Sequence, residues 1–137
     1  MSDKFFLDTN ILVYAFIENG EKCQKVKRLL DESPESFAIS TQVLNEFYNA
    51  LSKHKVEHKQ IVSAVNEITT FCEVDSVTLQ TVTKAYTIKE RYGFSYWDCL
   101  ILSAALENGC NQIFSEDMHD GQIIEGTLKI VNIFKNI

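Results

Sequence analysis

This chain contains neither a long apolar run nor a start that resembles a leader peptide. Its apolar stretches are far shorter than the ~20 residues that a membrane-spanning helix needs. The segment Ser2-Asp3-Lys4 includes an acid, and the apolar run after it ends at Asp8 without a small-residue cleavage site. We therefore expect a cytoplasmic protein with no signal peptide and no contact with a membrane.

Closely spaced cysteines are also missing. The four cysteines are far apart in the sequence, and no two of them form the C-x-x-C pair of a zinc or redox site. Of the three histidines, His54 and His58 would share a helix face only if one helix continued through both. We expect reduced, mostly buried thiols and no metal site built from histidine or cysteine.

Basic residues are scarce relative to acidic ones. The 137 residues contain 13 Lys and Arg against 19 Asp and Glu, which gives a net charge of -6. Because neutralisation of phosphates by Lys and Arg supplies most non-specific affinity for nucleic acid, this balance argues against a broad basic binding surface. We expect weak binding of bulk nucleic acid.

Repeats, low-complexity segments and linkers are absent, and a composition of 45% hydrophobic and 23% charged residues is ordinary for a globular protein. We expect one domain over residues 1–137, long enough to bury its own core. The only proline, in Ser33-Pro34, is placed to end a helix.

Apolar periodicity predicts strands that alternate with helices. The predicted strands cover residues 4–7, 37–39, 73–77, 112–114 and 129–134. The predicted helices cover residues 10–17, 21–32, 41–53, 59–71, 79–91 and 96–107. This order predicts right-handed crossovers and a mainly parallel sheet with helices on both faces.

Two acidic residues follow predicted strands closely. Asp8 comes directly after the first strand, and Asp117 follows the fourth strand after only Ser115 and Glu116. Ligands of parallel sheets bind beyond the carboxyl ends of the strands, so both acids are expected at that edge. Taken alone, Asp8 could simply cap the next helix, and Asp117 could belong to a plain polar loop.

Two further acids occur in predicted helices. Glu46 borders the apolar stripe of its helix, although it could be an ordinary solvated position. Asp98 matches a capping box with Ser95, yet the helix that follows is apolar nearly all round and is therefore expected to be buried. The helix dipole contributes only about 0.3 to 1 kcal/mol, too little to ionise a buried acid without a cation or hydrogen bonds.

Together the four acids describe oxygen ligands of the kind that Mg²⁺ or Mn²⁺ takes. We interpret Asp8, Glu46, Asp98 and Asp117 as candidate catalytic and metal-binding residues. Two divalent cations would offset their negative charge locally.

At these residues the chain resembles the PIN domain family, and particularly the toxin ribonucleases of VapBC toxin–antitoxin systems. The family pattern has Asp-Thr/Ser-Asn after the first strand, a Glu in the helix after the second, an Asp near the start of an apolar helix and Thr/Ser-x-Asp after the fourth strand. The matching residues are Asp8-Thr9-Asn10, Glu46, Asp98 and Ser115-Glu116-Asp117, and Ser115 keeps the hydroxyl of the commoner threonine.

The resemblance implies a three-layer α/β/α sandwich with a central, mainly parallel sheet of four to five strands. It also implies a homodimeric, Mg²⁺- or Mn²⁺-dependent endoribonuclease that a cognate VapB-like antitoxin blocks. In that interpretation the four acids hold the metal, and the residues that orient them or touch the phosphate are Thr9, Asn10 and Ser115. An acidic pocket is also suited to bind an antitoxin arginine.

The sequence also has to be compared with two other functions. The domain could be a catalytically weak binding module for RNA or a protein partner, against which the presence of all four acids argues. It could also be a phosphoacceptor receiver domain, which needs adjacent acids after the first strand and a lysine after a late one. Here Thr9-Asn10 follows Asp8, and no lysine follows Phe114.

Overall fold

The computed structural model describes residues 3–17, 20–32 and 36–135. Its strands are β1 (Lys4–Leu7), β2 (Ser36–Ser40), β3 (Cys72–Asp75), β4 (Gln112–Phe114), β5 (Ile123–Ile124) and β6 (Leu128–Val131). Its helices are α1 (Thr9–Ile17), α2 (Glu21–Glu32), α3 (Thr41–Lys53), α4 (His58–Phe71), α5 (Leu79–Tyr92) and α6 (Tyr96–Glu107).

The strands form one sheet in the order β3-β2-β1-β4-β6-β5. All neighbours are parallel except β5, which pairs antiparallel with β6. The chain moves from β1 through β2 to β3 in one direction and then returns to place β4 on the other side of β1. Such a reversal leaves a crevice at the carboxyl ends of the two central strands, β1 and β4.

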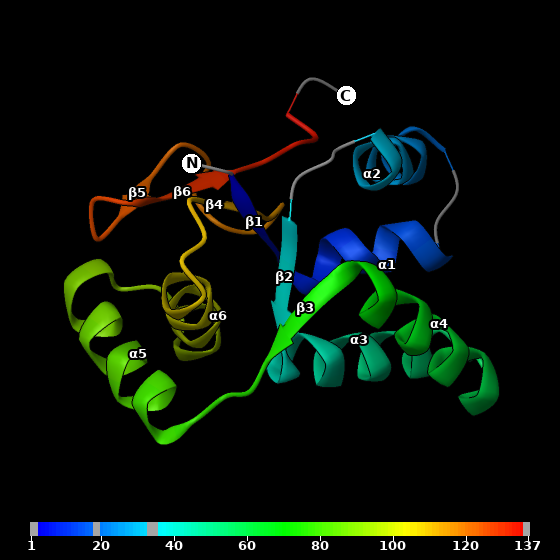
Figure 1. The fold of residues 1–137 in the computed structure, drawn as a ribbon, viewed down its shortest axis with the longest axis horizontal. Coiled ribbons are helices and arrows are strands. Elements are labelled where there is room, and N and C mark those ends of the chain that lie inside the picture. The colour runs from blue at the N-terminus through cyan, green and yellow to red at the C-terminus, as the bar shows by residue number, and fades with distance from the viewer. Residues whose placement is uncertain (1–2, 18–19, 33–35, 136–137) are drawn as a thin grey trace.

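Helices cover both faces of the sheet. Figure 1 shows α5 and α6 together on one side, whereas α1, α2, α3 and α4 lie on the other. This separation follows from right-handed crossovers. The connections from β1 to β2 and from β2 to β3 run in one direction along the sheet, and the connection from β3 to β4 runs in the other. Connections of the same hand that run in opposite directions place their helices on opposite faces. The three-layer α/β/α fold predicted from the sequence is confirmed.

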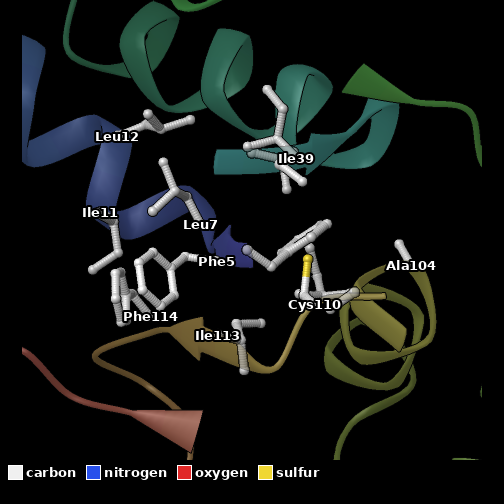
Figure 2. Packing of buried hydrophobic residues seen from close by; sticks show 14 of the residues in the cluster. Phe5, Leu7, Ile11, Leu12, Ile39, Ala104, Cys110, Ile113 and Phe114 are labelled. Atoms are coloured by element: carbon white, nitrogen blue, oxygen red, sulfur yellow. The ribbon is translucent and has the colours of Figure 1, made fainter. Parts of the chain in front are cut away.

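The core lies on both faces of the central strands. Figure 2 shows apolar side chains of β1, β2, β4, α1 and α6 packed around the sheet. In β1, Phe6 and Leu7 are fully buried, as is Ile113 in β4. Phe5 stacks on Phe114 of β4 with 5.0 Å between ring centroids. These contacts fix the ends of β1 and β4 side by side.

The predicted elements agree with the observed ones apart from one additional strand and small shifts in the bounds of others. The sheet has six strands, one more than the sequence suggested, because the loop before the last strand contains β5. A two-residue strand carries no periodic signal, and it pairs through a hairpin in which Glu125 and Gly126 both have positive φ. The last strand ends at Val131 rather than residue 134, and the third begins one residue earlier than predicted.

Three smaller points concern the end of α2, the cysteines and membrane-spanning helices. Helix α2 ends at Glu32, and the Ser33-Pro34 pair expected to end it lies outside the described residues. All four cysteines are buried free thiols, as predicted. Within the described residues, no helix is both long and apolar enough to cross a membrane.

Candidate active site

Asp8 lies directly beyond β1, at the crevice between β1 and β4. Its backbone N–H donates to the Phe114 carbonyl at 3.0 Å, so the strand pairing continues to the residue itself. The side chain is 6% exposed. Its Oδ1 accepts from the Thr9 N–H at 2.7 Å, and its Oδ2 accepts from the Ser115 hydroxyl at 2.7 Å. The bond from Thr9 is local, whereas the bond from Ser115 joins Asp8 to the segment that follows β4.

Ser115 and Asn10 connect Asp8 to Asp117. The Ser115 Oγ, which donates to Asp8, also accepts from the Asp117 N–H at 3.3 Å. The Asn10 amide donates to Asp117 Oδ2 at 3.0 Å and lies 3.5 Å from Asp8 Oδ2. Asp117 itself is exposed. The polar residues after β1 and after β4 therefore form one hydrogen-bonded group.

Glu46 joins this group through Thr9. The Thr9 hydroxyl donates to Glu46 Oε1 at 2.7 Å, across the interface of α1 and α3. The other carboxylate oxygen accepts from the Gln42 side-chain amide at 3.0 Å. Ser40 caps α3 by accepting from the Val43 N–H, which sets the helix start and hence the side on which Glu46 lies. Glu46 thus has both oxygens hydrogen-bonded at the edge of the core.

Asp98 lies in the first turn of α6, whose residues from Cys99 to Ala105 are buried as the sequence predicted. Ser95 caps this helix by accepting from the Asp98 N–H at 3.2 Å. The Asp98 side chain is intermediate in exposure, with its neighbour Trp97 open to solvent. The cap sets the backbone position of Asp98 at the start of α6.

The pKa values show that the four acids lie close enough to repel one another. Burial raises the pKa of the Asp8 carboxyl above its ordinary 3.8 to about 6; the bonds from Ser115 and Thr9 counter this only in part, and the charges of Asp98 and Glu46 add to it. Burial also raises the pKa of Asp98; a hydrogen bond with Ser95 counters this only in part, and the charges of Asp117 and Glu46 add to it. The ionised site therefore has excess negative charge.

No basic side chain compensates this charge. Among the described residues, neither lysine nor arginine forms an ion pair with any of the four acids. The donor set consists of carboxylate, hydroxyl and amide oxygens, which suits a hard divalent cation. The residues therefore fit a magnesium or manganese ion by chemistry and by charge.

The four acids nevertheless do not close around a single point. Over residues 3–17, 20–32 and 36–135, no three His, Cys, Asp or Glu side chains are arranged so that they could hold a metal ion. Hydrogen-bonding side chains separate the acids instead: Thr9 stands between Asp8 and Glu46, and Asn10 between Asp8 and Asp117. The structure brings the predicted residues to one edge without assembling a metal cage.

Sequence reasoning missed two polar contributions at this edge. Glu116 accepts a 2.6 Å bond from the Tyr14 hydroxyl and forms an ion pair with Lys22 of α2. Gln42 is buried and links Glu46 to the Trp97 carbonyl. Nothing in the sequence around Glu116 indicated its role, because its hydrogen-bond and ion-pair partners come from distant segments of the chain. Gln42 could have been identified from the sequence, because it is a polar residue on the apolar face of α3.

Comparison with known proteins gives a consistent result. The sequence profile of the PIN domain family matches residues 5–119. No curated protein sequence matches the chain. Among solved structures, VapC20 of Mycobacterium tuberculosis, described as a toxin that cleaves the sarcin-ricin loop, is similar with a TM-score of 0.69 and 22% identity, over 82% of this chain and 91% of that one.

Two similar structures are toxin–antitoxin complexes on DNA. VapBC2 of Rickettsia felis, bound to a promoter fragment, has a TM-score of 0.68 and 21% identity over 94% of this chain and 99% of the other. The DNA-bound VapBC of Salmonella typhimurium has a TM-score of 0.68 and 19% identity over 93% and 98%. At these identities the likeness establishes the shared fold.

Proposed function

The chain belongs to the PIN domain family, and from that premise we propose that it is a metal-dependent endoribonuclease that acts in the cytoplasm as the toxin of a type II toxin–antitoxin system. The proposal assigns residues 1–137 to one nuclease domain. The observation that carries it is the hydrogen-bonded group at the carboxyl ends of β1 and β4, where Asp8, buried and linked to both strands, has no basic partner among the described residues.

Asp8, Asp98 and Asp117 would hold Mg²⁺ or Mn²⁺, and Glu46 would hold or orient a second ion or its water. A bound divalent ion supplies an activated water and offsets charge on the phosphate oxygens. The excess negative charge of the ionised acids supports this assignment, because a cation would relieve it. Since the acids do not close around a single point, cation binding requires some of their side chains to move.

Thr9, Asn10 and Ser115 would position the carboxylates. Each of them already donates to one of the four acids, which fixes the direction of the acceptor oxygens. Residues that hold metal ligands in this way commonly change metal affinity or activity by about 10- to 100-fold when they are replaced. Asn10 and Asp117 lie at the more exposed side of the group, where a scissile phosphate can approach.

Two protein partners belong to the proposal. A VapB-like antitoxin would block the site, and an arginine is suited to the purpose because its guanidinium binds carboxylates bidentately. The similar toxin–antitoxin complexes support such a partner. A homodimer is supported by α5, where Leu79 and Tyr86 are two turns apart and are 79% and 53% exposed.

The decisive experiment measures RNA cleavage by the purified protein with Mg²⁺ or Mn²⁺ and with excess chelator. Cleavage is expected only with the metal, and Asp98→Asn is expected to abolish it while leaving the fold unchanged by circular dichroism. Asp120→Asn is the matched control, since Asp120 accepts a hydrogen bond from the backbone of Asn132 and pairs with Lys135 outside the group of four acids. Full activity of Asp98→Asn, or cleavage in chelator, would refute the mechanism.

One observation favours a second candidate function, a binding module with negligible turnover. The described acids form no preassembled metal cage. Titration calorimetry with Mn²⁺ separates the two functions, because the nuclease must bind the ion and Asp8→Asn must weaken that binding. A protein that binds RNA but no divalent ion would be the binding module.

A further inference from the structure

A groove of about 480 Å³ opens beside the acids, between the first turns of α3 and α6. Its wall includes Glu46, so the groove and the acidic group share a residue. The other lining residues are Thr41, Gln42, Asn45, Val77, Trp97 and Leu100.

Trp97 presents an aromatic surface to this groove. It is 63% exposed although it precedes the buried part of α6, and it is adjacent in sequence to Asp98. The Tyr96 ring packs edge-on against it with 5.1 Å between centroids, which restricts the indole without covering it. A large exposed ring beside candidate metal ligands is suited to stack on a planar ligand.

Gln42 gives the groove a fixed polar group. Its Nε2 donates to Glu46 Oε2 at 3.0 Å and to the Trp97 carbonyl at 3.1 Å. Because both partners are acceptors, the amide cannot be flipped without losing both bonds. Its Oε1 is buried and accepts no hydrogen bond within the described part of the chain. Gln42 therefore connects the aromatic wall to Glu46 and retains an unmatched acceptor.

The charge of the groove decides what part of an RNA it suits. No lysine or arginine lines it, so it offers nothing to neutralise a phosphate. Val77 and Leu100 provide apolar contacts, and the side chains of Asn45 and Thr41 provide hydrogen-bonding groups. An aromatic ring, an apolar floor and polar side chains match a nucleobase rather than a sugar–phosphate backbone.

We propose that this groove binds one nucleobase of single-stranded RNA, stacked on Trp97, next to the phosphate that the acids would cleave. The proposal rests on the proposed function and names the part of the substrate that the site recognises. Gln42 is a positioning residue in it, since it holds the Trp97 backbone and Glu46 together. Every base has a π-face, so stacking on Trp97 does not depend on which base is bound. It selects for a nucleotide that is unpaired.

The fluorescence of Trp97 provides the test, since it is the only tryptophan in the chain. A short single-stranded oligoadenylate is titrated into the protein in excess chelator and again with Mg²⁺. Quenching of Trp97 is expected under both conditions. The same ribose-phosphate chain without bases should leave the emission unchanged.

Variants then measure the contribution of the ring. Trp97→Leu is expected to weaken oligoadenylate binding by roughly 5- to 100-fold, the range found when aromatic stacking partners of single-stranded nucleic acid are removed. Trp97→Phe should restore most of the affinity. Tyr48→Leu is the matched control, because Tyr48 is exposed and packs on His58 but does not line the groove. Affinity is measured with end-labelled RNA, so that all variants give a signal.

Three results would overturn the proposal: no quenching under either condition, equal quenching by the base-free chain, or unchanged affinity of Trp97→Leu. Sedimentation provides a further check, since loss of a dimer in Trp97→Leu would show that a second copy covers the groove. Quenching without any RNA cleavage would refute the nuclease and leave the base site standing. Metal-dependent cleavage together with unchanged RNA affinity of Trp97→Leu would support the nuclease and refute the base site.

Discussion

Glu116 and Asp117 are neighbours in the sequence, yet they lie in opposite electrostatic settings. Burial alone would raise the pKa of Glu116, but hydrogen bonds from Lys22 and Tyr14 lower it below its ordinary value. Asp117, in contrast, receives its side-chain bond from the neutral Asn10 and adds to the repulsion that raises the pKa of Asp98. One carboxylate is paired with a lysine of the protein, and the other belongs to a group of acids without an ion pair among the described residues.

This difference separates Glu116 from the four candidate site acids at a single edge of the sheet. The Glu116 ion pair and the Tyr14 hydroxyl connect the segment after β4 to α1 and α2. The raised pKa values of Asp8 and Asp98 indicate that ionisation of these two carboxyls disfavours the folded state. Acids that a fold gathers without cations are the stronger candidates for metal binding.

The largest expected effect comes from removing the central acid. Asp8→Asn should reduce metal-dependent RNA cleavage by at least roughly 100-fold, more than the loss typical of a residue that only supports a metal ligand. Glu116→Gln should change it by less than about tenfold, because Glu116 already has its own cation. Initial rates with labelled RNA at saturating Mg²⁺ measure both. Equal losses in the two variants would remove the distinction between them.

Ser115 should have the next largest effect on activity. Ser115→Ala removes the hydroxyl that donates to Asp8 and accepts from the Asp117 N–H, so a loss of roughly 10- to 100-fold is expected. Ser115→Thr keeps the hydroxyl and should remain within a few-fold of the wild type. Cleavage rates measured over a range of Mn²⁺ concentrations show whether the loss lies in metal affinity. A fully active alanine variant would mean that Asp8 is oriented without Ser115.

The pH dependence of stability offers a third way to compare the two settings. Because the pKa of Asp8 is about 6 in the folded protein and 3.8 ordinarily, its protonation stabilises the fold below pH 3.8, and this contribution is lost as the pH rises through 6. Asp8→Asn should therefore become more stable relative to the wild type by on the order of 2 to 3 kcal/mol between pH 4 and pH 8. Urea unfolding in chelator at several pH values measures this difference.

For Glu116 we expect the opposite dependence of stability on pH. Its lowered pKa favours the folded state at neutral pH, and this contribution is lost in acid. Metal should also reduce the Asp8 effect, because a cation that binds only the folded protein stabilises it. A constant difference between wild type and Asp8→Asn across the pH range would show that the Asp8 carboxyl has an ordinary pKa.

The smallest expected effect concerns the Glu116 ion pair. Side-chain exposure of 38% for Lys22 and 24% for Glu116 leaves the pair accessible to water and salt. Lys22→Met should therefore lower the melting temperature only slightly, and less at high salt. Thermal unfolding at low and high ionic strength measures this change. A large drop in the melting temperature would indicate that the pair is a major determinant of the fold.

Most of the fold was predictable because it depends on local patterns. The apolar runs in β1 and β4 and the nearly uniform apolarity of α6 identified buried elements, and alternation of strands with helices predicted a parallel sheet. The hairpin of β5 and β6 was not predictable, since two residues are too few to show a period. Its formation depends on pairing with β6 rather than on the residues Ile123 and Ile124 themselves.

The shared location of Asp8 and Asp117 was predictable, but the contacts of the candidate site were not. Asp8 and Asp117 could be assigned to one edge because both follow strands of a parallel sheet, and their positions there agree with the structure. Nothing in the sequence indicated that Thr9 would donate to Glu46, or that Gln42 would link Glu46 to Trp97. These bonds join residues from separate elements, so they exist only when the helices are packed.

The sequence by itself determined which residues form strands and helices, that the sheet is parallel and that acids stand at its carboxyl edge, because burial and hydrogen-bonding preferences are local properties of the chain. Only the tertiary structure decided which acids are compensated. Lys22 of α2 reaches Glu116 and not Asp117, and no cation among the described residues reaches Asp8. Electrostatic partnership depends on distance in space, which sequence separations of 94 residues and more do not reveal.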